Sequence, residues 1–374
     1  MALLIFILIL SVLVLIHELG HFTAAKINGV RVEEFGWGLP PRIYGKKFGE
    51  TIYSINLLPF GGFVKLTGED SPEENVKDPH NFAAKTPMQR IVILTAGVFM
   101  NVVLAVVVFY FFMFANGFKT FHMPLLFDYN FRFGHTERIG TVISGIQPGL
   151  PAEEAGIALG EAVTEINGIK VNSVPEFKKV LADQPEHPVT LTLLDLKDTT
   201  YASTRKVEVA PVLSEEDGSP VVGVYLMDSV SISYNTFAER ALSGFYHSYN
   251  MLGYSLSTLG NIFAISFQTK DMSLVSDSVS GPVGIYHLVD MVLEYGGPNA
   301  WLTLLDYMAL MSLSLAFINL MPFPALDGGR IVFVLFEGIT KKKPNPKLEA
   351  AFHQAGMLVL ISLLILVTIR DIAR

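Results

Sequence analysis

Four long apolar stretches dominate the pattern of hydrophobic and polar positions along the chain. A helix needs about 20 apolar residues to cross the hydrocarbon core of a bilayer. Stretches of that length predict transmembrane helices, which we expect at residues 1–25, 91–115, 301–329 and 350–370. In the third, the apolar run ends near residue 321 and a Pro- and Gly-rich motif follows it. The pattern therefore predicts an α-helical polytopic membrane protein.

The segment after the first apolar stretch has a different pattern. Residues 30–68 alternate short β-favouring runs with glycines, which predicts a strand–turn–strand unit, a membrane-associated β-hairpin region directly after the first helix. Two interpretations stay open: a plain cytoplasmic hairpin, or a re-entrant sheet edge that holds an extended substrate by strand addition. Residues 69–85, rich in acidic residues, Pro and Asn, predict a solvated linker.

Between the second and third apolar stretches lie two more segments. Residues 138–212 have the composition of a small soluble α+β domain, with short strands and helices near 151–155 and 174–182. Ser173 with Glu176 three residues later predicts a capping box at the second helix. Residues 236–270 mix aromatic, Ser, Asn and apolar residues, which favours interfacial helices over another crossing.

Composition and charge narrow the class of protein. Half of the chain is apolar (51%) and only 17% is charged, which is typical of an integral membrane protein. The net charge of −8 is spread without a basic block, so nothing indicates nucleic-acid binding. Because the chain has no cysteine, any metal site must use His and carboxylate ligands.

Basic residues predict how the chain lies in the membrane. Nine Lys or Arg residues lie between the first two spans, and Lys341, Lys342, Lys343 and Lys347 lie between the last two. By the positive-inside rule both connections are cytoplasmic, which puts both termini and the central domain outside. The N-terminal apolar stretch has no basic n-region and no small-residue cleavage site, so we expect a retained span.

Three ionisable side chains occur within the first span. His17 and His21 are four residues apart and share one helix face, and Glu18 lies one position further round. Such groups are costly in a membrane and indicate function by default. The H-E-x-x-H spacing is typical of metalloproteases, in which the histidines bind the metal and the Glu is the base.

The end of the third span offers a further ligand. Pro322 and Pro324 stop regular helix, which a membrane tolerates only where the backbone is buried in protein or lines a cavity. Asp327 follows this break and could be a third zinc ligand. At about 1.5 Å rise per residue, His17 lies roughly 22–25 Å and Asn319 roughly 27 Å from the outer ends of their spans. The two halves of the site therefore fall at a similar depth.

Two further polar side chains within the spans, Asn101 and His353, are candidates for a role near the site. Gly97 and Asn101 are four residues apart in the second span, where a small residue lets another helix approach and an amide can form hydrogen bonds. Helix packing and substrate contact both stay open for Asn101. His353, in the fourth span, is expected to line a cavity or the lipid interface.

Together these motifs resemble the site-2 protease family, in its bacterial regulator-of-sigma-E protease form. The resemblance rests on HELGH, on GVFMN at 97–101, on SGPVGI at 280–285 and on NLMPFPALDGG at 319–329. Residues 149–157 and 165–168 resemble a PDZ domain, although Gly160-Glu161 replaces the usual Gly-Asp. A single PDZ domain and the absence of Pro from the 97–101 motif are the other departures.

The resemblance implies a zinc-dependent intramembrane metalloprotease in a bacterial cytoplasmic membrane, with its PDZ-like domain outside and its site toward the cytoplasm. It implies that His17, His21 and Asp327 bind zinc (Zn2+) and that Glu18 is the general base. It implies that Asn319 binds the substrate backbone or the oxyanion. Further substrate contacts are implied for Asn101, Pro322 and Pro324. Substrates would be single-span membrane proteins such as anti-sigma factors, or signal-peptide-like segments, and the PDZ-like domain either reads them or filters them by size.

Two other classes of function compete with this one. A non-catalytic membrane scaffold or PDZ-based adaptor would be free to lose Glu18 or Asp327, yet both are present. A metal transporter predicts ionisable residues distributed across the spans, whereas here they gather at one depth.

Overall fold

The protein divides into two compact units. The computed structural model describes residues 1–374 except 70–77, 184–186, 197–202, 215–217 and 374. Residues 1–112 together with 266–374 form one unit, here called the membrane unit, and residues 113–265 form the other, the central unit. Each unit is described separately below.

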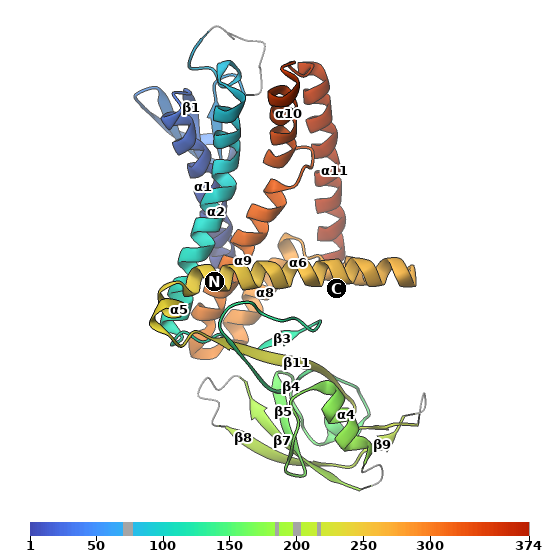
Figure 1. Cartoon of the computed structure of the whole chain (residues 1–374). Coiled ribbons are helices and arrows are strands. Elements are labelled where there is room, and N and C mark those ends of the chain that lie inside the picture. The colour runs from blue at the N-terminus through green and yellow to red at the C-terminus, as the bar shows by residue number, and fades with distance from the viewer. Residues whose placement is uncertain (70–77, 184–186, 197–202, 215–217, 374) are drawn as a thin grey trace. The chain divides into compact units, whose positions relative to one another are not determined.

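Four helices among the described residues are long and apolar enough to cross a membrane, as predicted. They are α1 (Ala2–Ile27), α2 (Pro87–Ala115), α9 (Ala300–Leu320) and α11 (Pro346–Ala373), labelled in Figure 1. Most of the apolar side chains of α11 are exposed, which suits contact with lipid. The predicted fold class, a polytopic helical membrane protein with an inserted β-sheet domain and a hairpin near the N-terminus, is confirmed.

The predicted hairpin forms a small sheet beside α1. It consists of β1 (Val32–Phe48) and β2 (Thr51–Leu66), and Phe35 lies opposite both Val64 and Tyr53. The first part of β1 therefore pairs with two separate parts of β2, one along each of its edges. Ser11 of α1 donates a hydrogen bond to the carbonyl of Pro59, 2.9 Å away, which ties the hairpin to the helix.

The predicted linker is only partly a linker. Residues 70–77 lie outside the described residues, but a short helix, η1 (Phe82–Ala84), follows them. Phe82 is buried in a cluster with Ala25, Val32 and Leu94, and the Asn81 side chain accepts a hydrogen bond from the Ala83 N–H. The prediction of a solvated linker was therefore wrong for the part around η1, because Phe82 is packed in the core.

The third predicted span is divided in two. Helix α9 ends at Leu320, and after a short loop α10 (Asp327–Thr340) begins at the predicted ligand. The sequence did not predict α10, nor α7 (Ser273–Ser278), α8 (Pro282–Tyr295) and η2 (Gly297–Asn299). Helix α8 opens at the SGPVGI motif, where the Asp371 carboxylate accepts hydrogen bonds from the N–H groups of Gly281 and Gly284.

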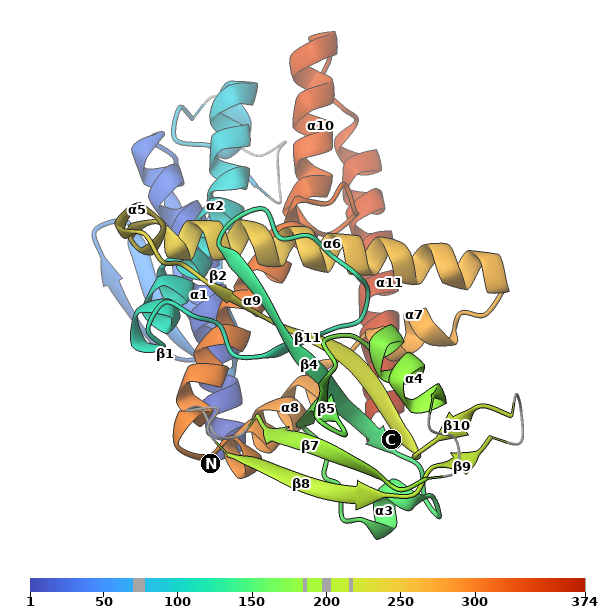
Figure 2. The ribbon, with the colours of Figure 1, turned by 60° about the horizontal axis from the view of Figure 1, so that its bottom comes forward.

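The central unit is built on a seven-stranded sheet (Figure 2). The strand order is β3-β11-β4-β5-β7-β8, with β6 paired to β5. The strands are β3 (Met123–Leu125), β4 (His135–Ile146), β5 (Glu161–Ile166), β6 (Ile169–Lys170), β7 (Val189–Asp195), β8 (Thr204–Val209) and β11 (Val224–Ser233). A separate small pair is formed by β9 (Val212–Leu213) and β10 (Pro220–Val221). Strands β3 and β11 lie outside residues 138–212, so the sheet is larger than the predicted domain.

The helices of the central unit overlap the ranges expected to be helical, while an interfacial position for residues 236–270 stays a prediction. They are α3 (Pro151–Glu154), α4 (Val174–Ala182), α5 (Phe237–Ala241) and α6 (Ser243–Thr269). The Ser173 side chain caps α4 by accepting from the Glu176 N–H, but Glu176 accepts from the Asn172 N–H rather than closing the predicted box on Ser173. Helix α6 is one long helix without any charged residue.

Candidate metal centre

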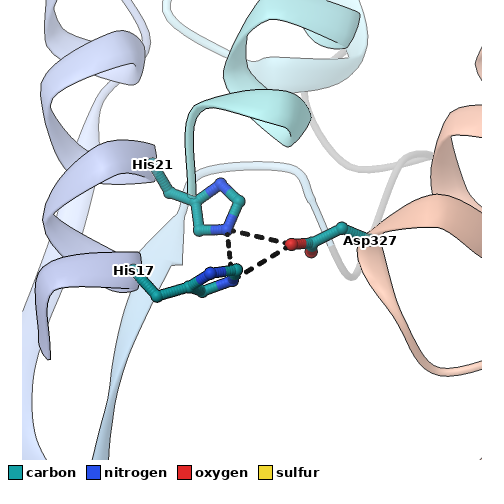
Figure 3. Close-up of side chains that lie close together, drawn as sticks. All are labelled: His17, His21 and Asp327. Carbon is teal, nitrogen blue, oxygen red and sulfur yellow. Dashed lines mark hydrogen bonds and ion pairs between the residues drawn. The ribbon is translucent and has the colours of Figure 1, made fainter. Parts of the chain in front are cut away.

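Helix α1 brings its two histidines together. One turn separates His17 from His21, and their ring centroids are 4.7 Å apart with an edge-on arrangement. Their Nε2 atoms lie 3.1 Å from each other, and both residues are buried. Figure 3 shows both Nε2 atoms directed toward the same point. The spacing of four residues on one helix is sufficient to produce this pair.

Asp327 completes the cluster from the first residue of α10 (Figure 3). Its Oδ2 lies 3.1 Å from the His17 Nε2 and 3.2 Å from the His21 Nε2. Tetrahedral zinc with ligand bonds of about 2.0 Å would hold its ligand atoms about 3.3 Å apart. Two imidazole nitrogens and a carboxylate oxygen are also ligands that zinc prefers, so these residues fit a zinc site by both spacing and donor type.

A second layer of contacts orients the two imidazoles. The Nδ1 of His21 lies 2.8 Å from the backbone carbonyl of Ile93, and the Nδ1 of His17 lies 3.3 Å from the Asn101 amide nitrogen. A metal-bound His17 carries its proton on Nδ1, so in that state the Asn101 amide would turn its oxygen toward it. That oxygen is buried and has no hydrogen-bond partner among the described residues. A proton on the His17 Nδ1 would supply one.

Glycines let α1 and α2 approach closely at this level. A Cβ atom on Gly20 would lie 2.3 Å from the Ala96 carbonyl oxygen, and one on Gly97 would lie 2.4 Å from the His21 Nε2. Real Cβ atoms do not occur at such distances, so both positions need glycine. The predicted small residue at position 97 thus makes room for the imidazoles as well as for the helix.

The cluster opens on a polar cavity of about 200 Å³. Glu18 lies in its wall, where its Oε2 accepts a hydrogen bond from the Val64 N–H at 3.0 Å. Arg330, on α10, forms an ion pair with Glu69. The lining residues are His17, Glu18, His21, Phe63, Val64, Leu66, Glu69, Ile93, Leu94, Ala325, Asp327 and Arg330. A polar cavity of this size is large enough to admit several water molecules next to the three candidate ligands.

The remaining predicted site residues do not line this cavity. Asn319 is half-buried on the last turn of α9, Pro322 is exposed, and Pro324 packs against Gly356 of α11. Asn101 is fully buried against His17. The described residues that line the cavity include none of these four. Their predicted catalytic or substrate-binding roles stay predictions.

Some residues of the cavity were not predicted. Arg330 lies three residues after Asp327, so helical spacing could have placed both on one face. No sequence pattern indicated that Glu69 lies in the cavity, because its segment resembled a solvated linker. Val64 contributes through its backbone N–H, which no side-chain pattern reveals.

Comparison with known proteins extends these observations. A family model described as peptidase family M50 matches residues 5–363. A provisionally named zinc metalloprotease of Clostridium perfringens is 36% identical over 367 residues, which cover 97% of this chain and 96% of that protein. Zinc metalloprotease RasP of Shouchella clausii is 30% identical over 442 residues, covering 100% of this chain and 99% of that protein. Among solved structures, the PDZ domain of an SdrC-like protein from Listeria monocytogenes is similar to 24% of this chain and 87% of that domain, with 19% identity and a TM-score of 0.21.

Proposed function

Because the chain belongs to peptidase family M50 and is a zinc metalloprotease with several membrane spans, we propose that it hydrolyses peptide bonds within or near transmembrane segments of other membrane proteins. One observation carries this proposal. The H-E-x-x-H motif lies on a membrane-length helix, and the ligand atoms of His17, His21 and Asp327 lie within 3.2 Å of one another.

We assign the zinc ligands to His17, His21 and Asp327. Three protein ligands leave the fourth position of a tetrahedral site open, as catalytic zinc requires. Zinc bound there would supply a Lewis acid that polarises the scissile carbonyl and makes water more acidic. Asn101 and the Ile93 carbonyl would hold the two imidazoles with their Nε2 lone pairs directed at the ion.

Glu18 is the proposed general base. Its carboxylate would take the proton from the attacking water and pass it to the leaving amine. The hydrogen bond from the Val64 N–H holds the carboxylate at the cavity wall. Asn319, half-buried before the loop that leads to Asp327, would hydrogen-bond the substrate backbone or the developing oxyanion, and Pro322 and Pro324 would contact the substrate. For Asn101, which is buried against His17, support of the imidazole is favoured over the predicted substrate contact.

The substrate would bind in an extended form. A helical peptide bond is hydrogen-bonded and shielded, so a transmembrane segment must unwind before it is cut. In β2 the Val64 N–H is directed to Glu18, which means that this strand presents a backbone donor to the cavity. We propose that the edge of β2 at Val64, which faces the cavity, takes the extended substrate by strand addition when Glu18 releases this N–H.

The basic residues support the proposed orientation. The positive-inside rule places the two Lys- and Arg-rich connections, and hence the catalytic side, in the cytoplasm, with the central unit outside the bacterial cytoplasmic membrane. Single-span membrane proteins, such as anti-sigma factors or signal-peptide-like segments, are the proposed substrates.

The central unit has a feature that favours peptide reading over size filtering. A cavity of about 960 Å³ lies between α4 and residues 212–214 and 219–226, with Val174, Phe177 and Leu181 in its wall. Apolar pockets next to strands are typical of sites that accept extended peptides. We therefore propose that this unit reads a substrate segment.

The proposal is tested by comparing cleavage of a single-span model substrate by the wild-type protein and a Glu18→Gln variant in lipid vesicles. Loss of the base should lower the rate by about 10²- to 10⁴-fold while zinc content is unchanged. Glu154→Gln, at an exposed position of the central unit, is the matched control and should cleave at the wild-type rate. Wild-type activity of Glu18→Gln would refute the mechanism. Cleavage of soluble peptides but never of membrane-embedded segments would refute the substrate class.

A further inference from the structure

Helix α11 contacts the loop that leads from α9 to Asp327, the first residue of α10. His353 of α11 is half-buried, and its Nδ1 accepts a hydrogen bond of 3.0 Å from the Ala325 N–H. Ala325 lies two residues before Asp327 in the loop between α9 and α10. This histidine, for which the sequence predicted only a cavity or lipid-interface position, therefore binds the backbone of the candidate metal site.

The backbone at Ala325 needs such support. Its φ is +70°, in the left-handed region, although it is not glycine. A residue with a Cβ atom is less stable in this conformation than glycine, because the Cβ approaches the following carbonyl oxygen. Strained backbone of this kind persists only where surrounding contacts hold it.

A second contact presses the same loop against α11. A Cβ atom on Gly356 would lie 2.0 Å from the Pro324 Cβ, so glycine is required for the loop to reach the helix. His353 and Gly356 are three residues apart and share one face of α11. On the other side, a Cβ atom on Gly329 of α10 would lie 2.3 Å from the Phe323 carbonyl oxygen. The loop is thus enclosed by α11 and the first turn of α10.

We propose that His353 is a positioning residue which, together with Gly356, holds the loop so that the Asp327 carboxylate faces His17 and His21. The inference rests on the proposed function, in which Asp327 binds zinc. His353 acts as a hydrogen-bond acceptor, which requires a neutral ring with its proton on Nε2.

A direct catalytic or metal-binding role does not fit His353. Its Nδ1 is occupied by the Ala325 N–H, and its ring lies against Phe333 and Phe352. Within the described residues, the group of side chains with metal-ligand spacing consists of His17, His21 and Asp327. His353 therefore acts through the loop rather than on the zinc or the substrate.

The test uses the full-length protein in detergent or nanodiscs and compares three replacements of His353. His353→Phe keeps a ring and removes the acceptor. His353→Asn keeps an acceptor near the position of Nδ1, and His353→Gln moves it toward the position of Nε2. Zinc affinity by chelator competition, the visible spectrum of the cobalt-substituted protein, kcat and KM are measured for each.

The Phe and Gln variants should bind zinc about 10- to 100-fold more weakly, as is usual when a group that orients a ligand is lost. Their cobalt spectra should change and kcat should fall, with KM close to that of the wild type. His353→Asn should recover zinc affinity to within about threefold. Leu358→Phe, at an exposed position of α11, is the control for a mutation in this helix and should change none of these values.

Two further variants separate positioning from simple loss of folding. Gly356→Ala should reproduce the weaker zinc binding of His353→Phe, because it displaces Pro324. Ala325→Gly removes the cost of the left-handed backbone, so adding it to His353→Phe should restore part of the zinc affinity.

Distinct outcomes would overturn the two proposals. Wild-type zinc affinity and an unchanged cobalt spectrum in His353→Phe, or equal zinc binding by the Asn and Gln variants, would refute positioning by His353. Asp327→Asn is measured in parallel. If it loses zinc while His353→Phe keeps it, the proposed function stands and only this inference fails; if it keeps zinc, the assignment of the site itself fails.

Discussion

The two halves of the candidate metal centre are built in different ways. His17 and His21 need only one turn of α1, since any regular helix places residues i and i+4 on one face. Asp327 instead follows a broken helix, a left-handed residue and a loop that contacts α11. The comparison teaches that the first half is a local property of the chain, whereas the second depends on contacts with distant segments. The predictions below test this difference.

The largest effect is expected for Asp327, the ligand that the second half of the centre supplies. Asp327→Asn removes the charge of the only carboxylate in the cluster, so zinc affinity should fall by more than the 10- to 100-fold typical of outer contacts, and activity should be lost. Metal analysis after dialysis against a chelator measures this. Asp306→Asn, in α9, is the control and should retain zinc. A Asp327→Asn protein with one tightly held zinc would contradict the ligand assignment.

Gly97→Ala, which affects the histidine pair of α1, should lower zinc affinity nearly as much. The new Cβ would meet the His21 Nε2 at 2.4 Å, so the imidazoles or α2 must move. We expect a loss of zinc affinity of at least about tenfold and a loss of about 1–3 kcal/mol of stability, as in other overpacked sites. Gly260→Ala is the matched control, because a Cβ there meets open space. Equal zinc binding by the two variants would show that α1 and α2 do not constrain the histidines.

Asn101→Leu distinguishes two roles for one buried amide. Support of His17 predicts zinc affinity lowered by about 10- to 100-fold with KM unchanged. Direct substrate contact predicts the reverse, a raised KM with zinc affinity intact. Since Asn101 is fully buried and its amide lies 3.3 Å from His17, we expect the first result. Chelator competition and steady-state kinetics on the same preparation decide between them.

The smallest effect is expected at Ser312. Its hydroxyl donates a hydrogen bond of 2.8 Å to the backbone carbonyl of Asn101, which joins α9 to α2. Ser312→Ala should cost about 1 kcal/mol of stability and leave zinc affinity almost unchanged. Thermal unfolding measures the first and chelator competition the second. Ser314→Ala, whose hydroxyl bonds within α9, is the control. A large loss of zinc affinity in Ser312→Ala would mean that the helical half also depends on distant contacts.

What the sequence could predict follows the same division. The four spans and the histidine pair depend on local pattern, and both were predicted. Asp327 was a candidate because two prolines and two glycines surround it at the depth of His17. Helix α10, the burial of Phe82 and the bond from Ala325 to His353 were not predicted, since each depends on a partner distant in the chain. Backbone donors such as the Val64 N–H are also invisible to patterns of side chains.

The distance along the chain between the two halves has a consequence for biosynthesis. His17 and Asp327 are 310 residues apart. At roughly 5–20 residues per second, a ribosome adds Asp327 about 15–60 s after it has added His17. With Asp327 as the third ligand, a nascent chain exposes its HELGH helix during that interval but holds only two ligands. Under this assignment the zinc site cannot be complete until the N-terminus of α10 has been made, so its assembly is one of the last steps in making the chain.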